Sequence, residues 1–85
     1  MKELSYLIKD HEGIHARPAG LLMKTASCFH SQIMLCKGGK KVDAKRIFAI
    51  MGLGVKCGEK ITITCEGIDE ADAASKLKIF LEENL

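Results

Sequence analysis

The chain is poor in the features that mark several large classes of protein. Its 85 residues include one proline and no tryptophan, and only 5% are aromatic. The formal net charge is +2, from 13 basic and 11 acidic residues, which is too mild a balance to indicate nucleic-acid binding. No apolar run approaches the roughly 18 residues of a membrane span, and Met1–Ser5 has an acid and no apolar signal core. The sequence therefore predicts no nucleic-acid partner, no membrane insertion and a cytoplasmic location.

The cysteines lack the close pairs that are typical of zinc sites and redox motifs. They lie eight, twenty-one and eight residues apart with no C-x-x-C pair, at Cys28, Cys36, Cys57 and Cys65. The three histidines show no ligand spacing among themselves either. Cys65 is in phase with an apolar strand pattern and is expected to be a small core residue. We therefore expect free thiols, no metal and no cofactor, with a small metal or thiol protein as the less favoured alternative.

What the chain does contain is enough apolar material for one folded unit. Hydrophobic residues make up 47% of it, and a chain of this size buries roughly 60–65% of its unfolded surface. Eighty-five residues leave no room for a second domain, so we expect a single domain over residues 1–85.

The apolar periodicity predicts four strands and three helices. The clearest strand is Lys60–Glu66, and Gly38-Gly39 predicts a hairpin between two further strands. Asp69 is placed to cap the last helix, and Gly52 or Gly54 to end the short one. The expected strands are about 4–9, 32–37, 40–43 and 60–66, and the expected helices are 16–28, 47–53 and 70–84. This α+β order, β-α-β-β-α-β-α, fits an antiparallel sheet with its helices on one face and the other face open to water.

The segment Gly13–Ala19, Gly-Ile-His-Ala-Arg-Pro-Ala, places a histidine and an arginine where a loop becomes a helix. Pro18 suits a first helical turn, where backbone N–H groups have no intrahelical partner. The free amides of Ala16 and Arg17 and the positive end of the helix dipole favour a bound anion, above all phosphate. The Arg17 guanidinium fits phosphate oxygens, and His15 is a nitrogen nucleophile able to hold a phosphoryl group. The alternative is that His15 is an ordinary surface or capping histidine.

This segment resembles the active-site motif of the HPr family, the histidine-containing phosphocarriers of the bacterial phosphoenolpyruvate:sugar phosphotransferase system. The resemblance continues in register through Thr25–Ser27, Gly39–Lys45, Leu53–Val55 and Glu59–Ile63. It implies an open-faced β-sandwich of four strands and three helices. It also implies that enzyme I phosphorylates His15, that Arg17 assists, and that A domains of sugar permeases receive the phosphoryl group. Such a carrier is itself transiently phosphorylated, is not a conventional turnover enzyme, and is expected to be a monomer.

The short helix has more apolar residues than the core can use, because only Ile50 and Leu53 are placed to reach it. We expect an exposed docking patch beside His15 that joins the outer side of the first helix to the short helix. Its predicted members are Gly20, Lys24, Ser27, Ile47, Phe48 and Met51, and its basic rim is Arg17, Lys24, Lys45 and Arg46. Such a rim suits acidic partner surfaces. The alternative is that Ile47, Phe48 and Met51 are core residues.

One position departs from the resemblance. Arg46 stands where HPr of low-GC Gram-positive bacteria has a regulatory serine, and arginine cannot take the ATP-dependent phosphate that the serine receives. The second functional interpretation is a regulatory module that keeps the fold and acts by docking to other proteins. The presence of His15 together with Arg17 favours the phosphocarrier, since a pure docking module needs neither.

Overall fold

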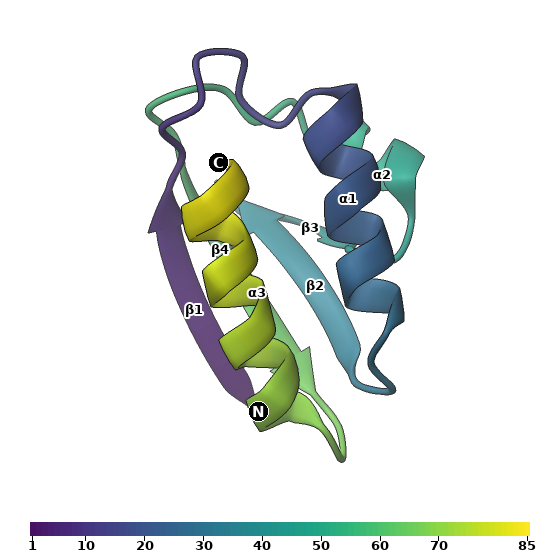
Figure 1. Cartoon of the computed structure of the whole chain (residues 1–85). Coiled ribbons are helices and arrows are strands. Elements are labelled where there is room, and N and C mark those ends of the chain that lie inside the picture. Colours follow the sequence, from purple (N-terminus) through teal and green to yellow (C-terminus); the bar gives the residue numbers. More distant parts are fainter.

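The computed structural model describes residues 1–85 as a four-stranded antiparallel sheet and three helices (Figure 1). This confirms the predicted fold class and element order. The sheet order is β1-β4-β2-β3. In chain order the elements are β1 (Lys2–Leu7), α1 (Ala16–Ser27), β2 (Gln32–Lys37), β3 (Lys40–Asp43), α2 (Ile47–Gly52), β4 (Lys60–Glu66) and α3 (Glu70–Asn84).

The central strand β4 shows why the sheet has one covered and one open face. Its apolar side chains Ile61, Ile63 and Cys65 are fully buried, while the threonines between them are half-buried. β4 pairs with β1 on one side and β2 on the other, so that Ile63 stands opposite both Leu4 and Leu35. Side chains alternate across a strand, which turns these apolar positions to the same face.

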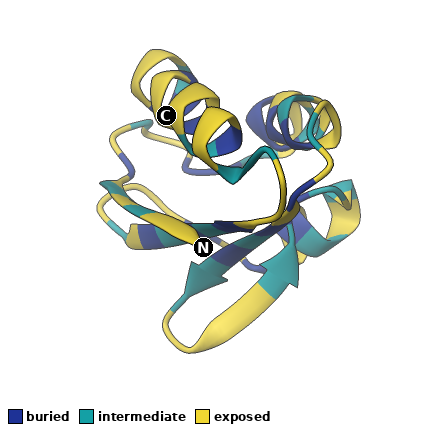
Figure 2. Cartoon of the chain, turned by 90° about the horizontal axis from the view of Figure 1, so that it is seen from below, coloured by how far each residue is buried: buried dark blue, intermediate teal, exposed yellow.

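The helices lie over that apolar face. α1 and α3 run side by side above the sheet (Figure 1), and buried residues gather between them and the strands (Figure 2). Leu22 and Ala26 of α1 and Leu77 and Leu81 of α3 are fully buried and belong to one core cluster of 19 residues. α2 packs against α1 and β3. No helix covers the opposite face of the sheet (Figure 2), where Leu7 is 53% exposed.

Glycines form the β2–β3 hairpin turn and end the short helix, as predicted. Gly38 and Gly39 have φ angles of +53° and +86°, the left-handed pair that a two-residue hairpin with a type I′ turn requires. Gly54, at φ +66°, follows the helical C-cap Leu53, and its N–H donates to the carbonyl of Met51 at 3.2 Å. Of the two glycines proposed to end the short helix, Gly54 does so.

The predicted boundaries differ from the structure by one or two residues. Ile8 is buried but lies beyond the end of β1, where its N–H donates to the Glu59 carbonyl at 3.0 Å. Ala74, expected in the core, is half-buried, whereas Phe80, expected at its margin, is 8% exposed. The helices α1 and α2 end one residue earlier than predicted, at Ser27 and Gly52, a difference that is common at helix ends.

All four cysteines are free thiols, but they occupy different environments. Cys65 is fully buried, as predicted, and burial raises the pKa of its thiol. Cys28 and Cys57 are exposed, so they do not serve as packing residues. Regarding membranes, none of the helices combines the length and the apolar character that a crossing would require.

Candidate functional site

His15 lies at the start of α1, as its N-cap residue. Its backbone is extended, with φ −93° and ψ −172°, and its carbonyl accepts the N–H of Ala19 at 2.9 Å. The side chain makes no capping hydrogen bond and is 37% exposed. The ring is therefore accessible to solvent and is not engaged in holding the helix.

The loop that precedes His15 is fixed by its two neighbours Gly13 and Ile14. Gly13 has φ +67°, and a Cβ at this position would lie 2.2 Å from the carbonyl oxygen of Val55. Ile14 is buried, and its N–H donates to that same carbonyl at 3.1 Å. Only glycine allows this close approach of two backbones, so the segment at Val55 determines the position of His15.

The first turn of α1 offers unpartnered backbone amides. The N–H groups of Ala16 and Arg17 donate to no group of the chain, and the first turn contains no acidic residue. Pro18 is buried and anchors the turn. Arg17 is exposed and belongs to none of the ion pairs of the structure. The helix start therefore presents two free donors and an unpaired guanidinium, an arrangement suited to an anion.

A cleft of about 280 Å³ lies beside this helix start. It is lined by Asp10, His15, Arg17, Pro18, Leu21, Glu83 and Asn84. The carbonyl oxygen of Leu85 accepts the N–H groups of Lys9 and Asp10, at 2.6 and 2.9 Å, and so brings the end of α3 to the loop. Glu83 and Asn84 were not predicted to lie here, because no local sequence pattern signals a contact between residues so far apart in the chain.

Two carboxylates that were not among the predicted site residues lie close to His15. The Glu12 carboxylate oxygen Oε2 lies 3.6 Å from His15 Nε2, and the ligand atoms of Asp10, Glu12 and His15 all lie within 4.8 Å of one another. Arg17 is the one cation among the residues that line the cleft, against the carboxylates of Asp10 and Glu83. The positive charge that would attract an incoming anion therefore comes from Arg17 and the start of α1.

The predicted docking patch has an exposed and a half-buried part. Phe48 is 83% exposed and Met51 39%, and Lys24 and Ser27 of α1 are exposed as well. Ile47 is half-buried against the core cluster. Its Cδ1 atom lies 3.5 Å from the place that a Cβ on Gly20 would take. Gly20 and Ile47 thus lie in the contact between α1 and α2, and Phe48 and Met51 remain exposed apolar side chains.

Lys45 does not serve as a free cation on the rim of the patch, contrary to the sequence-based prediction. Its Nζ atom donates to the carbonyl oxygen of Phe29 at 2.7 Å, and its side chain is partly buried. The ammonium group thereby ties the segment before α2 to the end of α1. Arg17, Lys24 and Arg46 are exposed and remain available on this side of the molecule.

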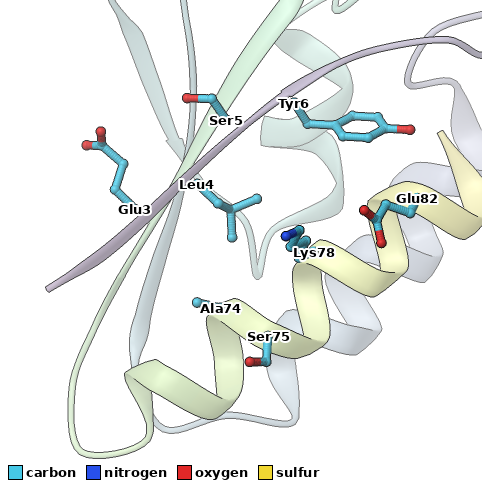
Figure 3. A pocket seen from close by; sticks show the side chains of 8 residues that line it. All are labelled: Glu3, Leu4, Ser5, Tyr6, Ala74, Ser75, Lys78 and Glu82. Carbon is cyan, nitrogen blue, oxygen red and sulfur yellow. The ribbon is translucent and has the colours of Figure 1, made fainter.

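The largest hollow of the molecule, about 490 Å³, is a different place. It lies between β1 and α3, where Leu4 and Tyr6 point toward the helix and Lys78 and Glu82 rise from it (Figure 3). Glu3 and Ser5 point to the other side of the strand (Figure 3). Neither histidine nor arginine lines this hollow, so it offers neither a nitrogen nucleophile nor a guanidinium for phosphate.

Comparisons with known proteins agree on one family. The family model described as "PTS HPr component phosphorylation site" matches residues 2–83. The chain is 35% identical to the histidine-containing phosphocarrier protein of a mycoplasma, with a TM-score of 0.94 over 96% of this chain and 93% of that one. It is 47% identical to HPr of Thermoanaerobacter tengcongensis, with a TM-score of 0.93 over 98% and 93% of the two chains. It is also similar to Crh, the catabolite-repression protein of Bacillus subtilis, solved as a swapped dimer, at 36% identity, a TM-score of 0.78 and coverage of 100% and 98%.

Proposed function

The chain belongs to the HPr family of phosphocarrier proteins of the phosphotransferase system, and from this membership we propose that His15 carries the phosphoryl group. The donor would be phosphorylated enzyme I and the acceptors the A domains of sugar permeases. The observation that supports the proposal most strongly is the position of the half-exposed His15 ring, which directly precedes the unpartnered amides of Ala16 and Arg17.

The transfer needs no proton to move within the carrier. A neutral imidazole nitrogen attacks phosphorus with its lone pair, and the bond to the donor breaks with its electron pair remaining on the donor. The ring then holds the phosphoryl group and a positive charge, which makes it a good leaving group for the next transfer. Glu12 lies 3.6 Å from Nε2, and its negative charge would oppose a phosphate on that nitrogen. Nδ1, the nitrogen that the family resemblance implies, is therefore the favoured acceptor.

Incubation with phosphoenolpyruvate and enzyme I tests this proposal. We expect the chain to gain one acid-labile, base-stable phosphate, and the His15→Ala variant to gain none. His11→Ala is the matched control, because His11 is exposed in the same loop but does not line the cleft. Equal phosphate incorporation in wild type and His15→Ala would contradict the proposal.

We propose that partners dock on the face formed by Gly20, Lys24, Ser27, Phe48 and Met51, with Ile47 supporting it from below. Phe48→Ala should slow transfer by roughly tenfold or more, since a buried aromatic anchor contributes about 2 kcal/mol to an interface. Its own stability should change by no more than about 0.5 kcal/mol, because exposed side chains contribute little to folding. Ile68→Ala is the control, because Ile68 is 95% exposed and belongs to the β4–α3 loop, and this loop lies at the other end of the molecule from α2 (Figure 1). A large loss of stability in Phe48→Ala would assign this residue to the core instead.

We also propose that the chain does not receive the ATP-dependent regulatory phosphate. Arg46 occupies the N-cap of α2, is exposed and makes no capping hydrogen bond, so nothing at this position can replace the serine hydroxyl. After incubation with ATP and HPr kinase, mass spectrometry should find no phosphate at the start of α2. The Arg46→Ser variant restores a hydroxyl and is the positive control, and phosphate there in the wild-type chain would contradict the proposal.

A regulatory docking module is the second candidate function, and the similarity to Crh favours it. This function would use the exposed Phe48 and Met51 without phosphoryl transfer. Complexes with partner proteins that form equally well with wild type and His15→Ala, while enzyme I phosphorylates neither, would select it. The similar structures include dimers, so the monomeric state stays a prediction.

A further inference from the structure

We propose that Asp10, Glu12 and His15 bind a divalent transition-metal ion, and that the bound ion prevents His15 from accepting a phosphoryl group. The starting observation is that one ligand atom from each side chain lies within 4.8 Å of the other two. The spacing of these residues, two and three positions apart, matches no zinc motif, so no metal was expected from the sequence. The second half of the proposal rests on the proposed function; the binding itself does not.

The donor set suits a borderline ion such as Zn²⁺. One imidazole nitrogen and two carboxylate oxygens are ligands that zinc accepts, with a fourth position open to water. Zinc–ligand distances of about 2.1 Å place tetrahedral ligands about 3.4 Å apart, close to the 3.6 Å between Glu12 Oε2 and His15 Nε2. The Glu12 side chain is 75% exposed and the His15 side chain 37%, so both can turn to complete the site.

Neither of the two carboxylates forms an ion pair with a lysine or arginine, and the His15 imidazole is the one side chain within ion-pair distance of Glu12. Asp10 Oδ1 accepts the N–H of Glu12 at 2.9 Å, which holds the loop closed around the cluster and leaves Oδ2 free. Gly13 and Ile14 fix the same loop against Val55. The loop backbone therefore places the three side chains near one another before an ion arrives.

Metal binding and phosphoryl transfer would compete for the lone pairs of one ring. A neutral imidazole has one nitrogen with a lone pair and one with a proton. An ion on Nε2, the nitrogen that faces Glu12, uses the lone pair there and leaves the proton on Nδ1, which then cannot attack phosphorus. An ion on Nδ1 would block that nitrogen directly. In either case the metal-bound carrier cannot be charged.

Titration of the unphosphorylated chain with ZnCl₂, followed by calorimetry and by the ¹⁵N resonances of the imidazoles, tests the binding without enzyme I. We expect one saturable site, with the His15 resonances showing a proton on one nitrogen and metal on the other. Glu12→Gln and Asp10→Asn should each weaken binding at least tenfold, since loss of even an outer-shell partner costs about 10–100-fold. His11→Ala should bind as wild type does. Cys57 is an exposed thiol and thus another possible zinc ligand. Zinc binding that is lost in Cys57→Ser but kept in Glu12→Gln would overturn the proposed site. Unchanged His15 resonances on addition of zinc would do the same.

The second experiment measures phosphorylation by enzyme I with and without ZnCl₂, each variant relative to its own metal-free rate. Zinc should inhibit charging of the wild type and leave the relative rate of Glu12→Gln nearly unchanged at the same concentration. The Glu12→Gln variant also controls for inhibition of enzyme I itself by zinc, because such inhibition would slow its phosphorylation as well. Tight binding to His15 with no charging even without metal would leave the metal site standing and refute the proposed function. Normal charging with no zinc binding would refute the metal site alone.

Discussion

The two long helices begin in opposite ways. α1 begins at His15 with no capping side chain, no acid in its first turn and two amides without partners. α3 begins at Asp69 with two acids, Glu70 and Asp72, in its first turn. The Glu70 carboxylate accepts the N–H of Gly67 at 3.1 Å and pairs with the terminal ammonium of Met1 at 2.8 Å. Carboxylates thus occupy the positive end of α3, while the corresponding end of α1 is left open.

Asp69 does more than mark the start of α3. The sequence predicted a capping residue, and Asp69 occupies that position, but its carboxylate makes no capping bond. It accepts the N–H groups of His30 and Ser31, at 2.8 and 2.9 Å, and the hydroxyl of Ser31. These bonds, the hydroxyl first, lower the pKa of Asp69 from 3.8 to about 2. The comparison indicates that one helix start contributes to holding the fold and that the other leaves backbone amides free for an external anion.

The largest effect is expected from removing the cation at the open start. Arg17→Ala should slow phosphoryl transfer roughly 100-fold, since loss of one group that stabilises transition-state charge costs about 10²–10³ in rate. The melting temperature should not change, because Arg17 is exposed and unpaired. Steady-state kinetics with enzyme I measures the change, and Arg17→Lys should recover part of it. A variant as fast as wild type would mean that the helix amides suffice without the guanidinium.

A change at the start of α3, where carboxylates occupy the helix end, should lower the stability of the fold and leave phosphoryl transfer intact. Because the pKa of Asp69 is lower in the folded chain than its ordinary 3.8, its contribution is complete above that value and is lost as pH falls toward about 2. Asp69→Asn should therefore melt at a lower temperature at pH 7, and the difference from wild type should shrink as the solution is acidified from pH 4 to pH 2. Asp72→Asn, with the same charge change on the same helix turn, is the control. A difference that is independent of pH would show that the charge of Asp69 is not what stabilises the contact.

The smallest effect is expected from making the start of α1 resemble that of α3. Ala16→Asp places a carboxylate in the first turn of α1 and should stabilise the fold by about 0.3–1 kcal/mol. The same energy acting against a phosphate would slow charging about two- to fivefold. Thermal melts and initial rates measure the two changes, with Ala16→Asn as the uncharged control. A gain in stability with no loss of rate would show that the phosphate binds elsewhere.

Local sequence patterns were enough to predict those parts of the fold that local interactions determine. The alternation of Ile61, Ile63 and Cys65 is a local pattern, and β4 has the predicted bounds. The left-handed pair Gly38 and Gly39 is local too. Asp69 marks the limit of this approach, because its position follows from neighbouring residues whereas its bonds to Ser31 depend on the packing of two loops 38 positions apart.

The candidate site at His15 likewise has a part that could be predicted from local sequence and a part that depends on how the chain folds. The sequence drew attention to His15 and Arg17 because the helix start around them is encoded within a few residues. It gave no sign of the proximity of Glu12, which depends on how the loop closes, or of Glu83 at the far end of the chain. Lys45 was misassigned for a related reason, since an exposed cation and a lysine bonded to a distant carbonyl look alike in a sequence.

The contact between Gly13 and Val55 bears on how this loop can diverge. A single methyl group at position 13 would meet a carbonyl oxygen at 2.2 Å, so the backbone there has no slack. The Glu12 side chain is 75% exposed and can change without moving the histidine that follows. The loop can therefore present different functional groups next to the His15 ring, as the carboxylates of Asp10 and Glu12 illustrate, while the position of the ring in the fold stays the same.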